Sequence, residues 1–223
     1  MKLHMKCRGK SKQKGNLVVA ILALVAVIGV ISVWLMSGDT NTTSSSNSTA
    51  DVMGSSIAND GGAIKATFDT LVINGASASS ITFIPATAGS NNILDPTNGI
   101  QYPVSNPNAF TNTTFPNGAW IYNGTGFKGN GIGTSAVDQV ALVAGVKDGV
   151  CQNINSRAHA STTIPASGLA SSVFTSGALA ATPTGTGSPD LSAVAGVAGW
   201  VAGCVSTTNG TDNNVYFRVL KAN

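Results

Sequence analysis

Apolar residues form one unbroken run near the start of the chain, from Leu17 to Met36, and this run contains no charged side chain. At a rise of roughly 1.5 Å per residue, a helix of this length matches the roughly 30 Å hydrocarbon layer of a bilayer. A helix also satisfies its own backbone hydrogen bonds inside lipid. The pattern therefore predicts a transmembrane helix over residues 16–36.

Residues 1–15 form a basic leader without an acidic residue. Because cytoplasmic flanks of membrane helices carry the excess of Lys and Arg, we expect the leader in the cytoplasm and the rest of the chain beyond the inner membrane. A cleaved secretory signal is an alternative, but its apolar core is normally about 7 to 15 residues long and ends at a small-residue site. The sequence from Trp34 to Ser37 lacks such a site. Length and flanks leave an uncleaved anchor and leader processing both open.

Polar residues dominate after the membrane segment. The sequence SGDTNTTSSSNSTA, from Ser37 to Ala50, has almost no apolar side chain to bury. This composition predicts a flexible or glycan-bearing stretch in which helix continuity is lost, and it opens a Ser/Thr-rich spacer over residues 37–62. Asp51–Ala58 is a helix candidate within that spacer. After a break at Gly61 and Gly62, a short helix is expected from Ala63 to Leu71.

The remaining residues, 63–223, predict one exported head domain that combines helix and strand. Runs of β-branched and aromatic residues predict strands at Ser80–Ile84 and Ala119–Tyr122. The apolar run from Val137 to Val146 fits a helix or a strand equally well. The segment that follows it, through Cys151 and Ile154, is expected to be helical.

Two long regions of the head, Pro85–Gly118 and Pro165–Ala198, are rich in turn-forming or small residues and are expected to be surface loops. The segments Trp200–Ser206 and Val215–Lys221 flank the sequence TTNGTDNN and predict an antiparallel hairpin. Apolar residues occupy both faces of its second strand, so both faces can be covered. The expected fold class is α+β: a transmembrane helix, then a head with a small antiparallel sheet and long loops.

Charge narrows the class of partner. The chain has a net charge of +3, but six of its twelve basic residues lie in the leader. From Asn16 onward six basic residues stand against nine Asp, which is a net charge of −3. A sparse, mildly acidic exterior suits phosphate backbones poorly, so we do not expect the head to bind nucleic acid.

The three cysteines fall on two sides of the predicted membrane segment. Cys7 is expected to be cytoplasmic and reduced, whereas Cys151 and Cys204 lie in the exported region, where disulfides form and persist. We expect a disulfide between these two residues, which should add on the order of 4 kcal/mol of stability in the chain-entropy model. Two buried free thiols are the alternative.

The motifs along the chain predict no catalytic, cofactor-binding or metal site. Residues 124–129, GTGFKG, match the dinucleotide fingerprint in form, but the following NGIG continues a loop where a helix is needed. His159 is the one exported histidine and is expected to be a solvated loop residue, without the partners of a catalytic base. Neither exported Cys has a second metal ligand at a suitable spacing, and the chain has no Glu to close a calcium loop.

A short, Lys-rich leader that ends in Gly15 immediately before an apolar helix resembles the leaders of type IV pilins and pseudopilins. The resemblance implies that prepilin peptidase cleaves between Gly15 and Asn16, with methylation, and that the helix becomes the mature N-terminus. Family members usually carry Phe or Met first and Glu fifth in the mature chain, where this sequence has Asn16 and Ala20. In the family that Glu is thought to pair with the amino terminus of a neighbouring subunit. Its absence favours a minor, tip or initiating subunit.

The later part of the head carries a second resemblance, to a group of pilin-like periplasmic proteins. From Thr125 onward the chain contains, in order, TGFKGNGIG, VDQVALVAGVKDGVCQNIN, GWVAGCV and NNVYFRVLKAN. This order resembles the Trp strand, the helical Cys-x-x-Ile-Asn segment, the second Cys and the terminal Tyr-rich hairpin of that group.

These observations predict a single-pass inner-membrane protein with a periplasmic or extracellular head, acting as a non-enzymatic minor pilin or pseudopilin of a type IV pilus or type II secretion-like filament. Its expected partners are membrane lipid, other pilin subunits and prepilin peptidase. A membrane-tethered binding module is the alternative, which the Ser/Thr spacer supports. A hydrolase is a third, which would require His159 in a cleft beside a serine and a carboxylate.

Overall fold

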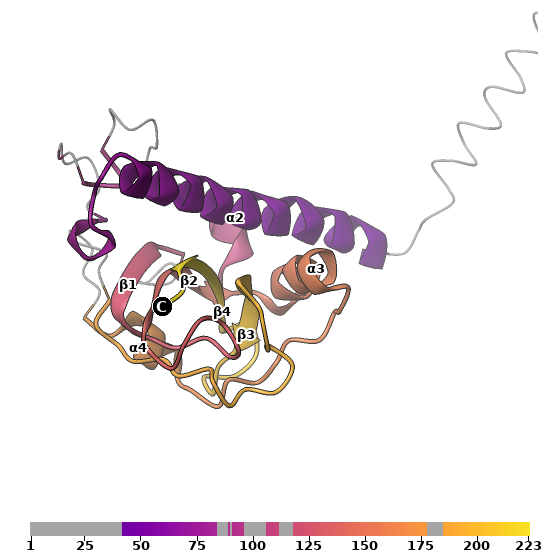
Figure 1. Ribbon diagram of the computed structural model, residues 1–223. Helices are drawn as coiled ribbons and strands as arrows, with labels where there is room; N and C mark the ends of the chain where they lie inside the picture. The colour runs from indigo at the N-terminus through magenta and orange to yellow at the C-terminus, as the bar shows by residue number, and fades with distance from the viewer. Residues whose placement is uncertain (1–41, 84–88, 90, 96–105, 112–117, 178–184) are drawn as a thin grey trace, which may run out of the picture. The chain divides into compact units, whose positions relative to one another are not determined.

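The four strands in the described part of the chain form one antiparallel sheet, with two helices against one of its faces (Figure 1). The computed structural model describes residues 42–83, 89, 91–95, 106–111, 118–177 and 185–223, with side chains from Ser48 onward. The chain divides into two units, residues 1–46 and 47–223, and nearly all described residues belong to the second unit. The strands are β1 Trp120–Phe127, β2 Asp138–Val146, β3 Ala202–Ser206 and β4 Asn214–Lys221. The helices are α2 Thr42–Ile73, α3 Asp148–His159 and α4 Ser171–Thr175, with 3-10 turns at Ala78–Ser80 and Pro107–Ala109.

Two hairpins lie side by side in the sheet. β1 pairs with β2, β3 pairs with β4, and β2 is antiparallel to β4 at the centre, which gives the order β1-β2-β4-β3. One row across the four strands consists of Trp120, Val143, Tyr216 and Cys204, and the next of Ile121, Leu142, Phe217 and Gly203. Because successive side chains of a strand alternate between faces, these two rows face opposite layers. The predicted C-terminal hairpin and the α+β class of the head are confirmed.

Helices α2 and α3 cover the first face of the sheet. The positions that α2 buries recur at intervals of four and three residues: Ile57, Gly61, Ile64, Phe68 and Leu71. This spacing places them along one side of a helix. They pack with the Trp120–Tyr216 row of the sheet and with the buried side chains of α3, among them Val150, Cys151 and Ile154. The predicted helical segment through Cys151 is therefore confirmed.

The helix candidates Asp51–Ala58 and Ala63–Leu71 are confirmed as parts of α2. The predicted break at Gly61 and Gly62 is wrong, as is the predicted loss of helix over the described residues before Asp51, because α2 runs unbroken from Thr42 to Ile73. Glycine in a helix interior costs about 1 kcal/mol relative to alanine. Gly61, however, lies where α2 comes close to the sheet, and a Cβ there would be 2.7 Å from the hydroxyl oxygen of Tyr216. Packing against the sheet thus overrides the local preference. Residues 37–41 lie outside the described part of the chain.

The second face of the sheet is covered by α4 and by loops. Its buried side chains include Phe174 of α4 and three residues spaced three apart, Leu191, Val194 and Val197. The described residues of Pro165–Ala198 are irregular outside α4, as predicted, but the prediction that this segment lies only on the surface is wrong, since it contributes these side chains to the core. Gly196 adopts a positive φ of 84°, which glycine tolerates and which lets the chain turn between successive buried residues.

Both faces of the sheet are covered, and this affects how the remaining strand predictions compare with the structure. Every residue of β2 is buried, which is why the apolar run from Val137 to Val146 showed neither helical nor alternating periodicity. The predicted strand at Ala119–Tyr122 is confirmed as the start of β1. The predicted strand at Ser80–Ile84 is wrong for its described residues: Ile81 and Phe83 are buried, but the segment makes a single bridge, from Thr82 to Asn92. Most of Pro85–Gly118 lies outside the described residues.

Candidate functional site

Two glycines allow α2 to lie close to its neighbours. Tyr216 stands in an edge-to-face contact with Trp120, with ring centroids 5.8 Å apart, directly where Gly61 meets the sheet. Burial raises the pKa of the Tyr216 hydroxyl to about 12, so it stays neutral. Two turns before Gly61 in α2, a Cβ at Gly54 would lie 3.0 Å from the side-chain oxygen of Asn153 and 3.3 Å from Ile154. Larger side chains at these two positions would push α2 away from the sheet and from α3.

The opposite side of α2 is exposed and uncharged. Its residues again recur at intervals of four and three, and we call them the outer row: Val52, Ser56, Asn59, Ala63, Ala66, Thr70 and Ile73. Val52 is 70% exposed and Ile73 is 83% exposed. The charged residues of α2 lie beside this row, where Lys65 pairs with Asp69 at 2.5 Å. Small, uncharged side chains in such a row permit close packing by another helix.

Side chains near the start of α2 hold it to α3. The carboxylate of Asp51 accepts hydrogen bonds from Arg157 at 2.5 Å and from the Asn153 amide at 2.7 Å. The Arg157 hydrogen bond, supported by Asn153, holds the pKa of Asp51 below its ordinary value. Because this ion pair is largely exposed, it orients the two helices more than it stabilises them.

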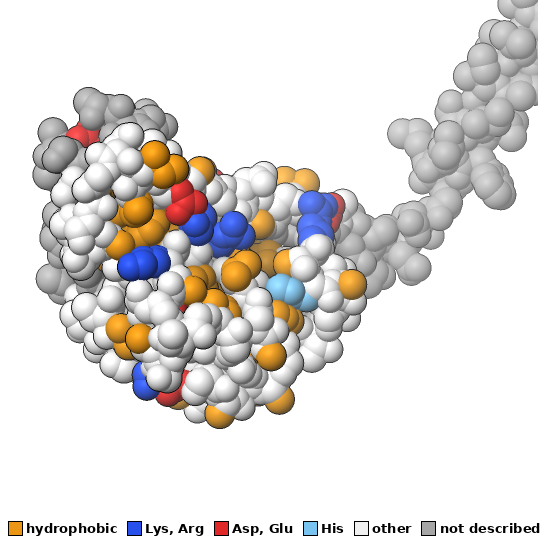
Figure 2. Space-filling model, viewed as in Figure 1, with side chains coloured by type: hydrophobic (Ala, Val, Ile, Leu, Met, Phe, Trp, Pro, Cys, Tyr) orange, Lys and Arg blue, Asp and Glu red, His pale blue; other side chains and the backbone are white. Residues whose placement is uncertain are grey.

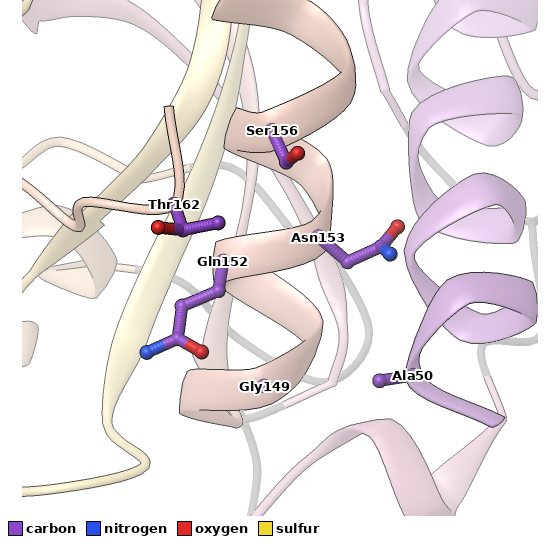
Figure 3. A pocket seen from close by; sticks show the side chains of 6 residues that line it. All are labelled: Ala50, Gly149, Gln152, Asn153, Ser156 and Thr162. Atoms are coloured by element: carbon purple, nitrogen blue, oxygen red, sulfur yellow. The ribbon is translucent and has the colours of Figure 1, made fainter. Parts of the chain in front are cut away.

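A pocket lies beside this contact and is lined by Ala50, Gly149, Gln152, Asn153, Ser156 and Thr162 (Figure 3). Its volume is about 440 Å³. In Figure 3 Asn153 points from α3 toward α2. None of the described lining residues is titratable, and these residues offer a ligand amide and hydroxyl groups.

The predicted disulfide between Cys151 and Cys204 is present and joins α3 to the edge strand β3. One turn after Cys151, the buried amide of Asn155 accepts a hydrogen bond from the backbone N–H of Cys204 at 2.8 Å and donates one to its carbonyl at 3.0 Å. His159, a further turn along, donates from Nε2 to the carbonyl of Ala202 at 2.7 Å. Side chains of α3 therefore occupy backbone groups that a further strand would otherwise bond.

The prediction that His159 is a solvated loop residue is wrong. His159 is the last residue of α3, and its ring stacks on Trp200 with the centroids 3.6 Å apart and the planes within 4° of parallel. The two rings border a pocket of about 390 Å³ with Ser161, Thr163, Pro165, Ala195 and Gly196. Serine is present in this pocket, but no carboxylate lines it among the described residues, so the arrangement named for a hydrolase is not formed here.

The glycines of the GTGFKG sequence lie in and just after β1. A Cβ at Gly126 would clash with the backbone of Gly187, which packs directly on this part of the strand. Gly129 leads into a loop and then β2, without the helix that a dinucleotide site requires. Within the described residues, no group of three or more His, Cys or Asp side chains is placed to hold a metal ion.

The predicted leader cleavage site, Gly15 and Asn16, and the predicted transmembrane segment lie outside the described residues. None of the helices that are described has the length and apolar character needed to cross a bilayer. Figure 2 shows that charged side chains are sparse on the face it displays, in keeping with the composition.

Comparison with known proteins returned no match to a family model, to a curated protein or to a solved structure.

Three features of the site were missed at the level of sequence: the contact made by Gly61, the stack of His159 on Trp200, and the bonds between Asn155 and Cys204. Each feature joins residues that are far apart in the chain, so no local sequence pattern predicts it. A partial signal existed in the spacing of Cys151, Ile154 and Asn155, which places all three on one side of a helix.

Proposed function

We propose that this protein is a minor pilin-like or pseudopilin-like structural subunit, anchored in the inner membrane by residues 16–36 and assembled through its helical part into a type IV pilus or type II secretion-like filament. The observation that carries the proposal is α2. It lies along the sheet through one side and presents an uncharged outer row on the other.

The packing of α2 weakens the rival function. A membrane-tethered binding module was supported by a flexible spacer between membrane and head, but from Thr42 onward the chain is helical, and from Met53 onward this helix packs in the core of the first face. A helix that leaves the membrane segment and packs its amphipathic half on the head is what the resemblance to pilins implies. The disulfide that fastens α3 to the sheet is a further point of agreement.

The outer row accounts for assembly without the missing Glu. Helices that associate without a charged docking pair rely on van der Waals packing, for which small residues such as Ala63 and Ala66 allow close approach. Other pilin or pseudopilin subunits are therefore the proposed partners, and prepilin peptidase is the proposed processing enzyme.

Leader processing is tested by expressing the full chain with and without prepilin peptidase and measuring the mass of the product. We expect loss of residues 1–15 and a new terminus at Asn16. A Gly15→Val variant should stay uncleaved, while the same change at Gly9, within the leader, should be processed normally. An unchanged mass of the wild-type chain in the presence of the enzyme would remove the processing claim.

Assembly is tested by shearing cells and asking whether the protein leaves with filaments. Ala66→Arg places a charge in the outer row and should strongly reduce the filament fraction. Ala198→Arg, at an exposed position in the loops over the second face of the sheet, is the matched control and should have little effect. If the wild-type protein stays with the membrane in strains that make filaments, a tethered module is the better account.

A further inference from the structure

Two residues of α3 hold a single residue of β3. Cys151 and Asn155 are four positions apart and thus lie on the same side of the helix. Cys151 is bonded to Cys204, and Asn155 hydrogen-bonds both the N–H and the carbonyl of Cys204, at 2.8 and 3.0 Å. The position of the Cys204 backbone is therefore determined twice, once by a covalent bond and once by a side-chain amide.

The amide of Asn155 is itself fixed in place. The residue is 0% exposed, and its Nδ2 also donates to the carbonyl of Thr163 at 3.0 Å. Both amide hydrogens are thus used, and the oxygen is directed at Cys204. An amide that offers one donor and one acceptor to the same residue reproduces what the backbone of a neighbouring strand would offer. These bonds do not depend on the sulfur atoms, so they can form while both cysteines are thiols.

We propose that Asn155 is a positioning residue for formation of the Cys151–Cys204 disulfide. In the reduced chain Asn155 holds the Cys204 peptide against α3. The Cα atoms of Cys151 and Cys204 then stay near the 5.4 Å separation that they have in the disulfide. That separation lies within the roughly 4.4–6.8 Å over which a disulfide can close. The 53-residue separation of the cysteines is then bridged by folding before the sulfur chemistry begins.

The reaction itself is ordinary thiol–disulfide exchange. Both protein thiols give up their protons and together two electrons to a disulfide oxidant such as oxidised glutathione, which is released as two glutathione thiols. Asn155 takes no part in these steps and acts only on the distance between the two sulfur atoms. The proposal does not rest on the filament function.

Each named residue of the Cys-x-x-Ile-Asn segment then has its own part in this arrangement. Cys151 supplies the sulfur, Ile154 is buried in the core of the first face, and Asn155 sets the position of the partner strand. A replacement of Asn155 by an apolar residue of similar volume would keep the core filled but remove the hydrogen bonds to Cys204 of β3.

The test is the equilibrium between the two thiols and glutathione. Full-length protein in detergent, with Cys7→Ser to leave one cysteine pair, is equilibrated in glutathione buffers, and the oxidised fraction is read by alkylation and mass spectrometry. Asn155→Leu is compared with Asn123→Leu. Asn123 is a matched control: it is also 0% exposed and bonds backbone groups, with Gly187 at 2.7 Å, but at the opposite edge of the sheet.

The equilibrium constant with glutathione gives the effective concentration of one protein thiol at the other. We expect Asn155→Leu to lower this effective concentration about tenfold more than Asn123→Leu does. The two variants should lose a similar amount of urea resistance in their oxidised forms. A milder variant, Asn155→Ser, serves in the same comparison if the leucine variant does not fold. Equal effects of the two asparagine positions would show a merely structural role and overturn the proposal, as would an unchanged effective concentration.

Discussion

The two faces of the sheet are covered by different kinds of structure. The first lies under two regular helices, α2 and α3, whereas the second lies under the short helix α4 and irregular segments. Both covers nevertheless bury large aromatic residues almost completely, with Phe68 2% exposed on the first face and Phe174 0% exposed on the second. Regular secondary structure is therefore not what makes a segment part of this core.

The covers also differ in how they are attached. The helical cover is fastened by side chains: the disulfide, the amide of Asn155 and the ring of His159. The loop cover is fastened by its backbone, since Gly185 donates to the carbonyl of Tyr122 at 2.8 Å and Lys128 donates to that of Pro189 at 3.0 Å. A helix has already used its backbone groups internally and must attach through side chains, while a loop keeps backbone groups free to bond a strand edge.

The largest expected effect tests whether the loop cover is as integral as the helical one. Phe174→Ala and Phe68→Ala should each lower the free energy of unfolding by about 3 to 5 kcal/mol, because each removes a fully buried aromatic ring. Urea denaturation of the full chain in detergent measures both. A loss below about 1 kcal/mol for Phe174→Ala, typical of a surface position, would contradict the core role of the second cover.

Removing the disulfide should separate the two covers. The double variant Cys151→Ser with Cys204→Ser should lose about 4 kcal/mol of stability in the chain-entropy model. Because the bridge joins α3 to β3, hydrogen exchange should rise more in α3 than in α4, whose attachment involves no cysteine. Uniform loss of protection across both covers would show that the faces do not open independently.

A third comparison uses adjacent glycines in α2. Gly61→Ala should cost about 1 to 3 kcal/mol, since its Cβ would crowd the buried ring of Tyr216. Gly62→Ala meets nothing within 4 Å and should instead stabilise the protein by about 0.5 to 1 kcal/mol through helix propensity. Thermal denaturation of both variants measures the difference, and stabilisation by both would mean that α2 does not approach the sheet this closely.

The same contrast explains what could be predicted from the sequence. The C-terminal hairpin, the helix bearing Cys151 and the disulfide were predictable because local composition, turn residues and compartment specify them. The helical character of residues 42–50 and the continuation of the helix through Gly61 and Gly62 were not, because Ser, Thr and Gly disfavour helix locally and packing of Gly61 on the sheet decides the outcome. Leu191, Val194 and Val197 recur every third residue, which fits neither helix nor strand, so their burial gave no recognisable signal.

The candidate site divides in the same way. The cysteine pair was found from chain position alone, whereas Asn155 and the outer row of α2 became visible when the partner surfaces were known. Whether a helix position faces the sheet or solvent depends on which side docks, and α2 has two rows with the same spacing, one beginning at Ile57 and one at Val52. The large apolar side chains Ile64, Phe68 and Leu71 mark the first row as the docking side in the sequence, but what the outer row faces is visible only in the structure.

The smallest expected effect concerns Asp60, which lies beside Gly61 on α2. Partial burial raises the pKa of its carboxyl, so folding disfavours the ionised form. Asp60→Asn should therefore give a slight gain in stability at neutral pH. That gain should disappear as the pH falls through the raised pKa and then below the ordinary value of 3.8, where the wild-type carboxyl is protonated in both states.

Asp69→Asn is the control on the same helix, because it removes the half-exposed ion pair with Lys65 and should lose up to about 1 kcal/mol instead of gaining stability. Denaturant titrations of the three proteins between neutral and acidic pH measure both differences. A gain from Asp60→Asn that persisted unchanged at acidic pH would show that the carboxyl is not penalised by burial.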